Sequence, residues 1–243
     1  ETLPGTLADF DADIFVVVAY GKIIPSSIFD IPEHGSINLH PSLLPHLRGA
    51  APVESAILEG ASESGITIQR ITERLDAGDI LAQESLQIGP DMTAGDLYEL
   101  VLPRGADLMM RVLSSLSSGT CVFRKQNESE ATYCGKITKE NARIEWKRPA
   151  SEIHNIIRAY NPKPVAWTSF RGSSLRIIKS KMFNDEEMRL APGELVVFRK
   201  KRIVAGTADL PIEILSLQPE NKKVMDGLSF INGYRIVPGD SFS

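Results

Sequence analysis

The fold is decided by the stretch Asp13-Ile14-Phe15-Val16-Val17-Val18-Ala19, a continuous apolar run of strand length that is rich in β-branched residues. Such a run is typical of a parallel strand buried on both faces of its sheet. A second strand is predicted over Ser36-Ile37-Asn38-Leu39-His40, ending at Pro41. Strand-like and helix-like segments alternate from here to about residue 117, so the sequence predicts an α/β domain whose parallel sheet is connected by crossover helices.

Later segments of the first half extend the same alternation. We expect further elements over residues 52–59 (helix), 65–71 (strand), 80–83 (strand) and 93–116 (helix). The long helix begins at Thr93-Ala94-Gly95-Asp96, which resembles a capping box. Pro103 lies inside that helix and is expected to kink or divide it, because proline has no backbone N–H to donate.

The second half of the chain changes in character. Residues 118–135 are rich in Ser, Thr, Asn and Glu and are predicted to form a linker between a first domain over 1–117 and a second over 136–243. The second domain is expected to hold one helix over 151–160 and short strands over 167–170, 175–181, 194–198, 202–205 and 212–217. Short strands at this spacing favour a small β-barrel.

Composition excludes several classes of protein. Apolar residues make up 42% of the 243 residues and charged residues 24%, which is ordinary for a soluble globular protein. No apolar run reaches the roughly 18 residues needed to cross a bilayer, so no membrane association is expected. The two cysteines, Cys121 and Cys134, form no metal-binding motif with each other or with histidine. We therefore expect neither a metal nor a disulfide, and a cytoplasmic location.

Charge is distributed unevenly along the chain. Residues 1–135 hold 8 Lys+Arg and 19 Asp+Glu, a net charge of −11, whereas residues 136–243 hold 19 and 12, a net charge of +7. A basic half attached to an acidic half is compatible with binding of a polyanion and, equally, with ordinary surface charge.

Two short polar segments carry the candidate chemistry. Asn38 and His40 share one face of their strand because side chains alternate, and they precede a loop at the edge where open α/β sheets bind ligands. Asp76 lies in Leu75-Asp76-Ala77-Gly78-Asp79, directly before the strand that starts at residue 80, and could close on this pair. Each segment also has a non-catalytic explanation. An isolated Asn-x-His is more often an ordinary hydrogen-bonded pair, and Asp and Gly are common in turns.

Taken together, the three side chains suit acyl transfer through a tetrahedral intermediate. Asn38 can donate its amide N–H to the developing oxyanion, and His40 can stabilise the same charge or move a proton. Asp76 is expected to raise the pKa of His40 by favouring the charged ring. No nucleophile elbow accompanies them, so direct transfer is favoured over an acyl-enzyme.

Four segments, in this order and spacing, resemble the 10-formyltetrahydrofolate-dependent formyltransferases. They are Asn38-Leu39-His40-Pro41-Ser42-Leu43-Leu44-Pro45, Arg48-Gly49-Ala50-Ala51-Pro52, Gly65-Ile66-Thr67-Ile68 and Leu75-Asp76-Ala77-Gly78-Asp79-Ile80. The resemblance implies 10-formyltetrahydrofolate as co-substrate, no metal, and catalysis by Asn38, His40 and Asp76. It also implies folate binding by Ser42, Leu43, Leu44 and Pro45, and by Ile23 and Ile24 in a segment that resembles the wall of the family's pterin pocket.

The second half resembles the C-terminal domain of the same family. Its stretch Leu215-Ser216-Leu217-Gln218-Pro219-Glu220-Asn221-Lys222-Lys223-Val224-Met225 is most similar to the members that formylate initiator methionyl-tRNA. The resemblance implies a Rossmann-like catalytic domain followed by an OB-like β-barrel that binds this tRNA, acting as a monomer. Phosphate contacts require basic side chains, and the candidates are Lys200, Lys201, Arg202, Lys222 and Lys223.

The resemblance starts at about Ala12, and it implies that further βαβ structure of the family, on the order of 60 residues, is missing at the N-terminus. An incomplete catalytic domain with one unpaired sheet edge is therefore expected.

Two alternatives stay open: a sugar-nucleotide formyltransferase, and a tRNA-binding protein with an inactive formyltransferase domain. The basic second half counts against the first, and the complete set of three catalytic residue types counts against the second. A dinucleotide-binding oxidoreductase is disfavoured because no Gly-x-Gly-x-x-Gly follows a strand.

Overall fold

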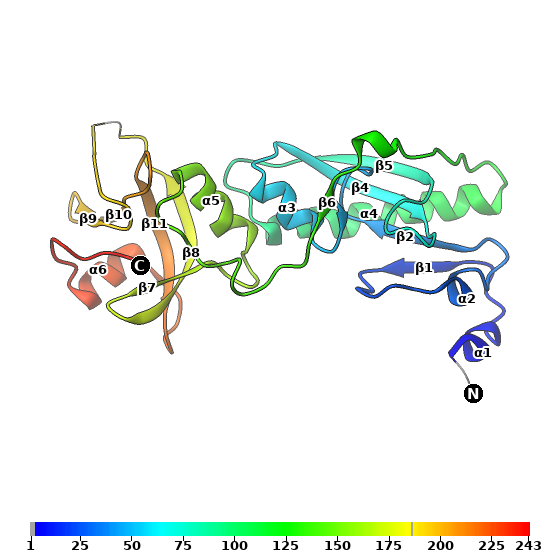
Figure 1. Ribbon diagram of the computed structural model, residues 1–243, viewed down its shortest axis with the longest axis horizontal. Helices are drawn as coiled ribbons and strands as arrows, with labels where there is room; N and C mark the ends of the chain where they lie inside the picture. Colours follow the sequence, from blue (N-terminus) through cyan, green and yellow to red (C-terminus); the bar gives the residue numbers. More distant parts are fainter. Residues whose placement is uncertain (1–2, 186) are drawn as a thin grey trace. The chain divides into compact units, whose positions relative to one another are not determined.

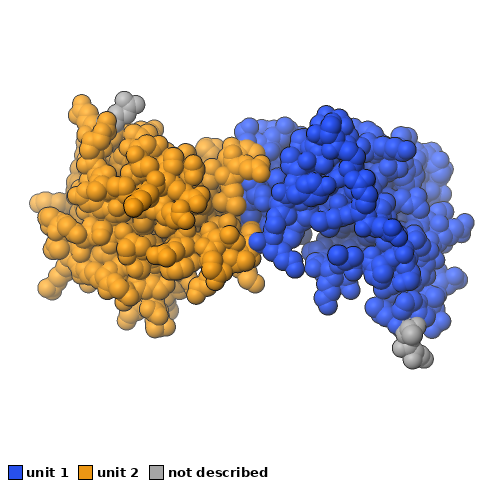
Figure 2. Space-filling view, viewed as in Figure 1, with its two compact units in different colours: residues 1–56, 62–88, 97–136 blue, residues 57–61, 89–96, 137–243 orange. Residues whose placement is uncertain are grey.

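The computed structural model describes residues 3–185 and 187–243, which divide into two compact units. Unit 1 comprises residues 1–56, 62–88 and 97–136, and unit 2 comprises residues 57–61, 89–96 and 137–243 (Figure 2). None of the helices in the described part of the chain is long and apolar enough to span a membrane.

Unit 1 contains a four-stranded sheet in the order β1-β2-β4-β5 (Figure 1). Its strands are β1 (Phe15–Val18), β2 (Ser36–His40), β4 (Glu63–Arg70) and β5 (Ile80–Gln87). Only β1 and β2 run parallel; β2 pairs with β4, and β4 with β5, in antiparallel fashion. The prediction of a parallel sheet is therefore wrong for two of the three strand pairings. Strands β4 and β5 are joined by residues 71–79 without a helix, as antiparallel neighbours can be, whereas the connection from β2 to β4 contains a helix at Pro52–Leu58.

Strand β1 forms one edge of this sheet and pairs only with β2 within the described residues. Its side chains alternate between half-buried and exposed, and Val16 and Val18 are 44% and 51% exposed. The prediction that this strand is buried on both faces is wrong in this structure, because nothing in the described chain covers the face that carries Val16 and Val18.

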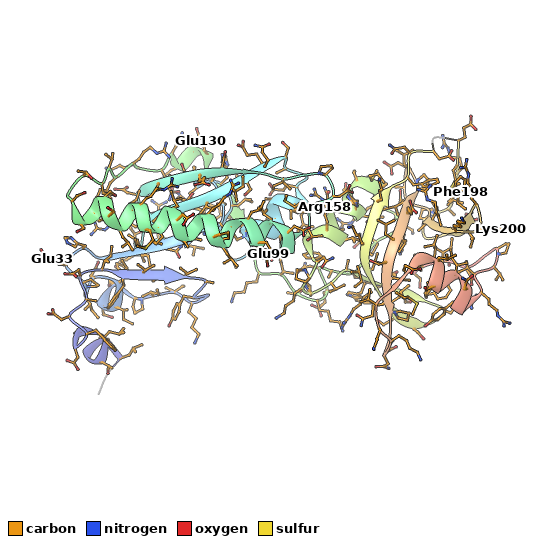
Figure 3. The ribbon with its side chains drawn as sticks, turned by 180° about the vertical axis from the view of Figure 1, so that it is seen from behind. Glu33, Glu99, Glu130, Arg158, Phe198 and Lys200 are labelled. Carbon is orange, nitrogen blue, oxygen red and sulfur yellow. The ribbon has the colours of Figure 1, made fainter. Side chains whose placement is uncertain are left out.

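The long helix α4 (Ala94–Ser117) covers one face of the sheet, as the two opposite views show (Figures 1 and 3). The approach is close at Gly105, where an added Cβ would lie 2.5 Å from Cδ1 of Leu39 on β2. The predicted capping box is confirmed: Asp96 N–H donates to Thr93 Oγ1 at 3.1 Å and Thr93 N–H donates to Asp96 Oδ2 at 2.9 Å. Pro103 does not divide the helix, which continues through it.

The remaining elements of unit 1 are short. They are α1 (Leu3–Ala8), α2 (Ser26–Phe29), β3 (Arg48–Gly49), α3 (Pro52–Leu58), the 3-10 helix η1 (Glu128–Glu130) and β6 (Tyr133–Cys134). Strand β6 pairs in parallel with β3, and Arg124 forms an isolated bridge with Ile80. The segment that the sequence assigns to a linker thus makes specific backbone contacts with the first unit.

Unit 2 holds the second sheet, in the order β7-β8-β11-β10-β9, with β12 added to β11. The elements are α5 (Ala150–Ala159), β7 (Trp167–Phe170), β8 (Ser173–Met182), β9 (Leu195–Phe198), β10 (Arg202–Ala205), β11 (Ile212–Pro219), β12 (Met225–Asp226) and α6 (Gly227–Tyr234). The five predicted strands and the predicted helix are present. The two edge strands β7 and β9 do not pair with each other in the described chain, so no closed barrel is formed.

The end of the chain lies between these two edge strands. Phe242 forms an isolated bridge with Phe170 of β7, and Ser241 forms one with Glu194, next to β9. Phe170, Phe230 and Phe242 pack as aromatic neighbours, with ring centroids of Phe170 and Phe230 5.3 Å apart. Helix α6, which carries Phe230, was not predicted from the sequence, because its short Gly-containing segment has little helical periodicity.

Candidate active site

The candidate catalytic residues of β2 lie on a polar face of the unit 1 sheet. In the antiparallel register Asn38 faces Gln69 and His40 faces Thr67 on β4. Directly opposite residues project to the same side of a sheet, so these four side chains share one face. His40 is buried, with 4% of its surface exposed, whereas Asn38 is half-buried. Its amide has no hydrogen-bond partner among residues 3–185 and 187–243, which leaves its N–H groups available to a ligand.

Asp76 lies in the turn between β4 and β5, with a backbone φ of +48°. Its Oδ1 accepts a hydrogen bond from Gln69 Nε2 at 2.8 Å, and its Oδ2 accepts one from the backbone N–H of Gly49 at 2.9 Å. The same Oδ2 lies 3.7 Å from Nδ1 of His40. The structure therefore brings His40 and Asp76 together, and Gln69 links Asp76 to the strand position opposite Asn38.

The imidazole of His40 has a defined hydrogen-bonding arrangement. Its Nε2 lies 2.9 Å from the carbonyl oxygen of Leu47, which can only accept, so Nε2 carries the proton. Burial lowers the pKa of His40 below its ordinary 6.5, outweighing the opposing effects of the Asp76 carboxylate and the Leu47 hydrogen bond. The expected effect of Asp76 is present, because its carboxylate raises the pKa of His40, but desolvation is the larger effect and the net shift is downward. The lowered pKa favours the uncharged ring, and with the proton on Nε2 the lone pair of Nδ1 faces Asp76.

Thr67 fixes the loop that follows His40. Its Oγ1 donates to the carbonyl of Ser42 at 2.7 Å and accepts from the backbone N–H of Leu44 at 3.1 Å. Gln83 Nε2 on β5 donates to the same Oγ1 at 3.0 Å and to the carbonyl of Leu44 at 2.8 Å. Ser42 and Leu44 are buried, so the backbone of this loop is held from inside the domain.

The other residues predicted to bind folate differ in their surroundings. Pro45 is buried, and Leu43 is half-buried against Gly65, where an added Cβ would lie 2.4 Å from Leu43 Cδ2. Ile23 is 88% exposed and Ile24 is half-buried, so Ile23 is not enclosed by the described residues. Among those residues, no group of three or more His, Cys, Asp or Glu side chains is arranged to hold a metal ion.

Sequence reasoning missed the glutamines and the threonine that hold this site. They are Thr67, Gln69, Gln83 and Gln126. The alternation of β4 could have placed Thr67 and Gln69 on one face, since they are two residues apart. Nothing local could have indicated Gln83 or Gln126, because glutamine is common on surfaces and their partners lie far away in sequence.

Comparison with known proteins shows the family to which this chain belongs. The sequence pattern "Formyl transferase" matches residues 1–113, and "Formyl transferase, C-terminal domain" matches residues 136–235. These two matches, on an α/β unit and a β-rich unit, describe a two-domain formyltransferase. The chain is 40% identical over 234 residues to the methionyl-tRNA formyltransferase of Fusobacterium nucleatum, covering 96% of this chain and 76% of that protein. This chain belongs to the formyltransferase family, in its methionyl-tRNA formyltransferase branch.

Solved structures share this architecture. HypX from Aquifex aeolicus, crystallised in complex with tetrahydrofolic acid, superimposes with a TM-score of 0.72 at 18% identity, over 96% of this chain and 42% of HypX. An N-formyltransferase from Helicobacter canadensis, in complex with folinic acid and dTDP-3-aminofucose, gives a TM-score of 0.70 at 25% identity, over 90% and 78% of the two chains. The likeness to HypX shows a common fold.

Proposed function

We propose that this protein transfers the formyl group of 10-formyltetrahydrofolate to the methionine amino group of initiator methionyl-tRNA, the reaction that prepares this tRNA for translation initiation. The observation that carries the proposal is the 40% identity to a methionyl-tRNA formyltransferase over 96% of the chain. The contact between His40 and Asp76, on the sheet face that also carries Asn38, supplies the chemistry that this reaction needs.

Acyl transfer to an amine places negative charge on the formyl oxygen when the amine nitrogen attacks the formyl carbon. Asn38 offers two amide N–H groups, neither used by the described protein, and a donor of this kind stabilises a developing oxyanion. The C–N bond to the amine forms in this attack, and the C–N bond to the folate nitrogen breaks afterwards, when the tetrahedral intermediate collapses and the carbonyl is restored. Removing one oxyanion donor typically lowers kcat by about 10²–10³-fold, so Asn38 has a substantial expected effect.

The reaction also requires that the amine lose a proton and that the leaving folate nitrogen gain one. His40 Nδ1 and Asp76 Oδ2, 3.7 Å apart, are both acceptors because Nε2 carries the imidazole proton. A donor placed between them, the amine N–H or a water molecule, can bond to both. His40 and Asp76 therefore form a proton-accepting pair, with Asp76 held in place through Gln69 and Gly49.

The loop after β2 has a fixed backbone, which suits it to binding a folate. The backbone of residues 42–44 is fixed by Thr67 and Gln83, and Thr67 is the cross-strand partner of His40. A rigid loop directly beside the proposed catalytic residues can hold a pterin in register with them. We assign folate contacts to the segment Ser42–Pro45, with Leu43 as its least buried side chain, and to Ile23 and Ile24.

We further propose that the basic unit 2 binds the tRNA. Residues 136–243 carry a net charge of +7, and phosphate contacts dominate binding to nucleic acids. Lys200, at the tip of the β9–β10 hairpin next to Phe198 (Figure 3), is exposed, as are Lys201, Lys222 and Lys223. Arg202 is the least suitable of the predicted contacts, because Glu213 already neutralises it and its guanidinium stacks 4.7 Å from the Phe183 ring. The OB-like character expected of unit 2 belongs to the same proposal, with the open sheet β7-β8-β11-β10-β9 as its β-structure.

The competing acceptor is the amine of a nucleotide-linked sugar, since the H. canadensis enzyme resembles this fold and is complexed with such a compound. The test gives the intact protein 10-formyltetrahydrofolate together with either initiator methionyl-tRNA or dTDP-3-aminofucose, and measures formylated product. Product from the tRNA alone supports the proposal. Product from the sugar alone overturns it, and tRNA binding without either product indicates an inactive formyltransferase domain.

A further inference from the structure

Residues 124–134, here called the strap, run beside both loops of the candidate active site. At one end Arg124 and Ile80 exchange backbone hydrogen bonds of 2.9 and 2.8 Å. At the other end Thr132 Oγ1 accepts from the backbone N–H of Leu47, whose carbonyl holds His40. The strap therefore contacts the segment that follows His40 and the segment that follows Asp76, although Gln126 lies 50 residues after Asp76 in the sequence.

Gln126 is the strap residue that contacts the Asp76 turn. Its Nε2 donates to the carbonyl oxygens of Asp76 and Gly78, both at 2.8 Å. One amide group thus joins two carbonyls of the turn in which Asp76 has a φ of +48°, a conformation that non-glycine residues rarely adopt. The same Nε2 lies 3.4 Å from Gln69 Oε1, and Gln69 donates to the Asp76 carboxylate. Gln126 contacts the backbone of the turn, and Gln69 contacts its side chain.

Arg48 fixes the orientation of the Gln126 amide. Its Nε and Nη2 donate to Gln126 Oε1 at 3.1 and 2.7 Å, and Arg48 has no exposed surface. Arginine can only donate and carbonyls can only accept, so the amide can face its neighbours in one way only. Glu128 accepts hydrogen bonds from Nη1 and Nη2 of Arg48 on the other side, and these bonds together with one from Arg74 lower the pKa of Glu128 to about 2. The chain of contacts runs from Glu128 through Arg48 and Gln126 to the Asp76 turn.

We infer that Gln126 is a positioning residue that sets the location of the Asp76 carboxylate relative to His40, and that it acts on the reaction only through Asp76. The inference rests on the proposed function. A displacement of about 1 Å at a reacting group can cost on the order of 100-fold in rate. Gln126 does not contact the folate loop, which Thr67 and Gln83 hold, so its loss acts on kcat and not on the KM for folate.

The experiment compares Q126E with Q83E in the intact protein. Both variants replace one side-chain nitrogen by oxygen, and both turn a donor that bridges two acceptors into a carboxylate that cannot donate. Q126E is expected to lower kcat for methionyl-tRNA formylation about 100-fold with the KM for 10-formyltetrahydrofolate within twofold of the wild-type value. Q83E, which loses its bonds to Thr67 and Leu44, is expected to raise that KM. A kcat for Q126E equal to the wild-type value, or an effect on KM alone, overturns the inference.

A double-mutant cycle separates positioning from general damage. In an Asp76→Ala background, Q126E is expected to lower the residual single-turnover rate no further, because the group that it positions is gone. A further large loss in that background contradicts action through Asp76. If Q126E does not fold, as judged by far-UV circular dichroism, Q126M is used, because it keeps the side-chain length and adds no charge. If the wild-type protein binds the tRNA but formylates no acceptor, the proposed function is overturned and this inference with it. If the wild-type protein is active and the Gln126 variants are equally active, only the inference is overturned.

Discussion

Replacing Thr67 by valine tests how the loop after β2 is held. Thr67 is fully buried, and its hydroxyl takes part in three hydrogen bonds, to the carbonyl of Ser42, from the N–H of Leu44 and from Gln83. Valine has nearly the same shape and no hydroxyl. Gln83 keeps its bond to the Leu44 carbonyl, whereas the Ser42 carbonyl and Leu44 N–H lose a partner. At about 1–1.5 kcal/mol for each of these two unpaired groups, we expect a loss of about 2–3 kcal/mol in the unfolding free energy.

Thr67→Ser is the matched control, because it keeps the hydroxyl and removes only a buried methyl group. Its expected cost is about 1 kcal/mol. Urea denaturation followed by far-UV circular dichroism measures both variants. The two tryptophans, Trp146 and Trp167, lie in unit 2, so their fluorescence follows a transition that neither substitution is expected to move.

The same substitution has an expected effect on substrate binding. A loop that is no longer fixed by Thr67 should raise the KM for 10-formyltetrahydrofolate about tenfold, equivalent to about 1.4 kcal/mol, in Thr67→Val and not in Thr67→Ser. The reasoning is refuted if valine is no more destabilising than serine. It is refuted equally if valine destabilises the domain and leaves this KM unchanged, because the loop would then not be the binding element.

Three further perturbations follow from the structure. Gly49→Ala places a Cβ 2.2 Å from the carbonyl oxygen of Cys134, at a φ of +121°, and so displaces the backbone N–H that binds Asp76. The kcat for formylation is expected to fall at least about tenfold, and an unchanged kcat would contradict this role of Gly49. Burial lowers the pKa of His154 below 6.5, so the folded protein binds fewer protons than the unfolded chain at acidic pH. The stability that His154 contributes is fully present above pH 6.5 and is lost as the pH falls through the folded pKa. The expected slope of the unfolding free energy is up to about 1.4 kcal/mol per pH unit. His154→Gln should flatten this dependence in urea titrations at pH 5, 6 and 7 followed by tryptophan fluorescence, and an unchanged slope would assign it to other groups. Arg48→Met leaves the Gln126 carbonyl without its donors and is expected to lower the unfolding free energy by about 2 kcal/mol, measured by far-UV circular dichroism, whereas a neutral result would show that this network adds nothing to stability.

Much of the framework could be predicted from local sequence patterns. The strands at Ser36–His40 and Glu63–Arg70 follow from alternation and β-branched content, and the capping box at Thr93 fixes the start of α4. The proximity of His40 to Asp76 was predicted because both flank strand ends of one sheet. Strand direction was not predicted correctly, because the hydrophobic pattern reports how much of a strand is buried, and β2 and β4 are largely buried although they pair antiparallel.

The details of the site depend on distant contacts and could not be predicted in the same way. Gln126 meets Asp76 across 50 positions, and its segment has the composition of a linker. The direction of the His40 pKa shift depends on the balance between burial and the nearby carboxylate, and only the structure shows that burial is the larger effect. The exposure of one face of β1 likewise depends on which other elements cover the sheet. The apolar sequence of β1 does not indicate whether that face is covered.

The most direct test of the central claim is transfer of a labelled formyl group from 10-formyltetrahydrofolate to initiator methionyl-tRNA by the intact protein, beside its Asn38→Ala, His40→Ala and Asp76→Ala variants. Each variant is also tested for tRNA binding. We expect formyl-methionyl-tRNA with the wild-type protein, a loss of at least about 100-fold in kcat in each variant, and tRNA affinity within a few-fold of the wild-type value. Unimpaired transfer by any one of the three variants would contradict the assigned role of that residue. No transfer to the tRNA by the wild-type protein would contradict the function itself.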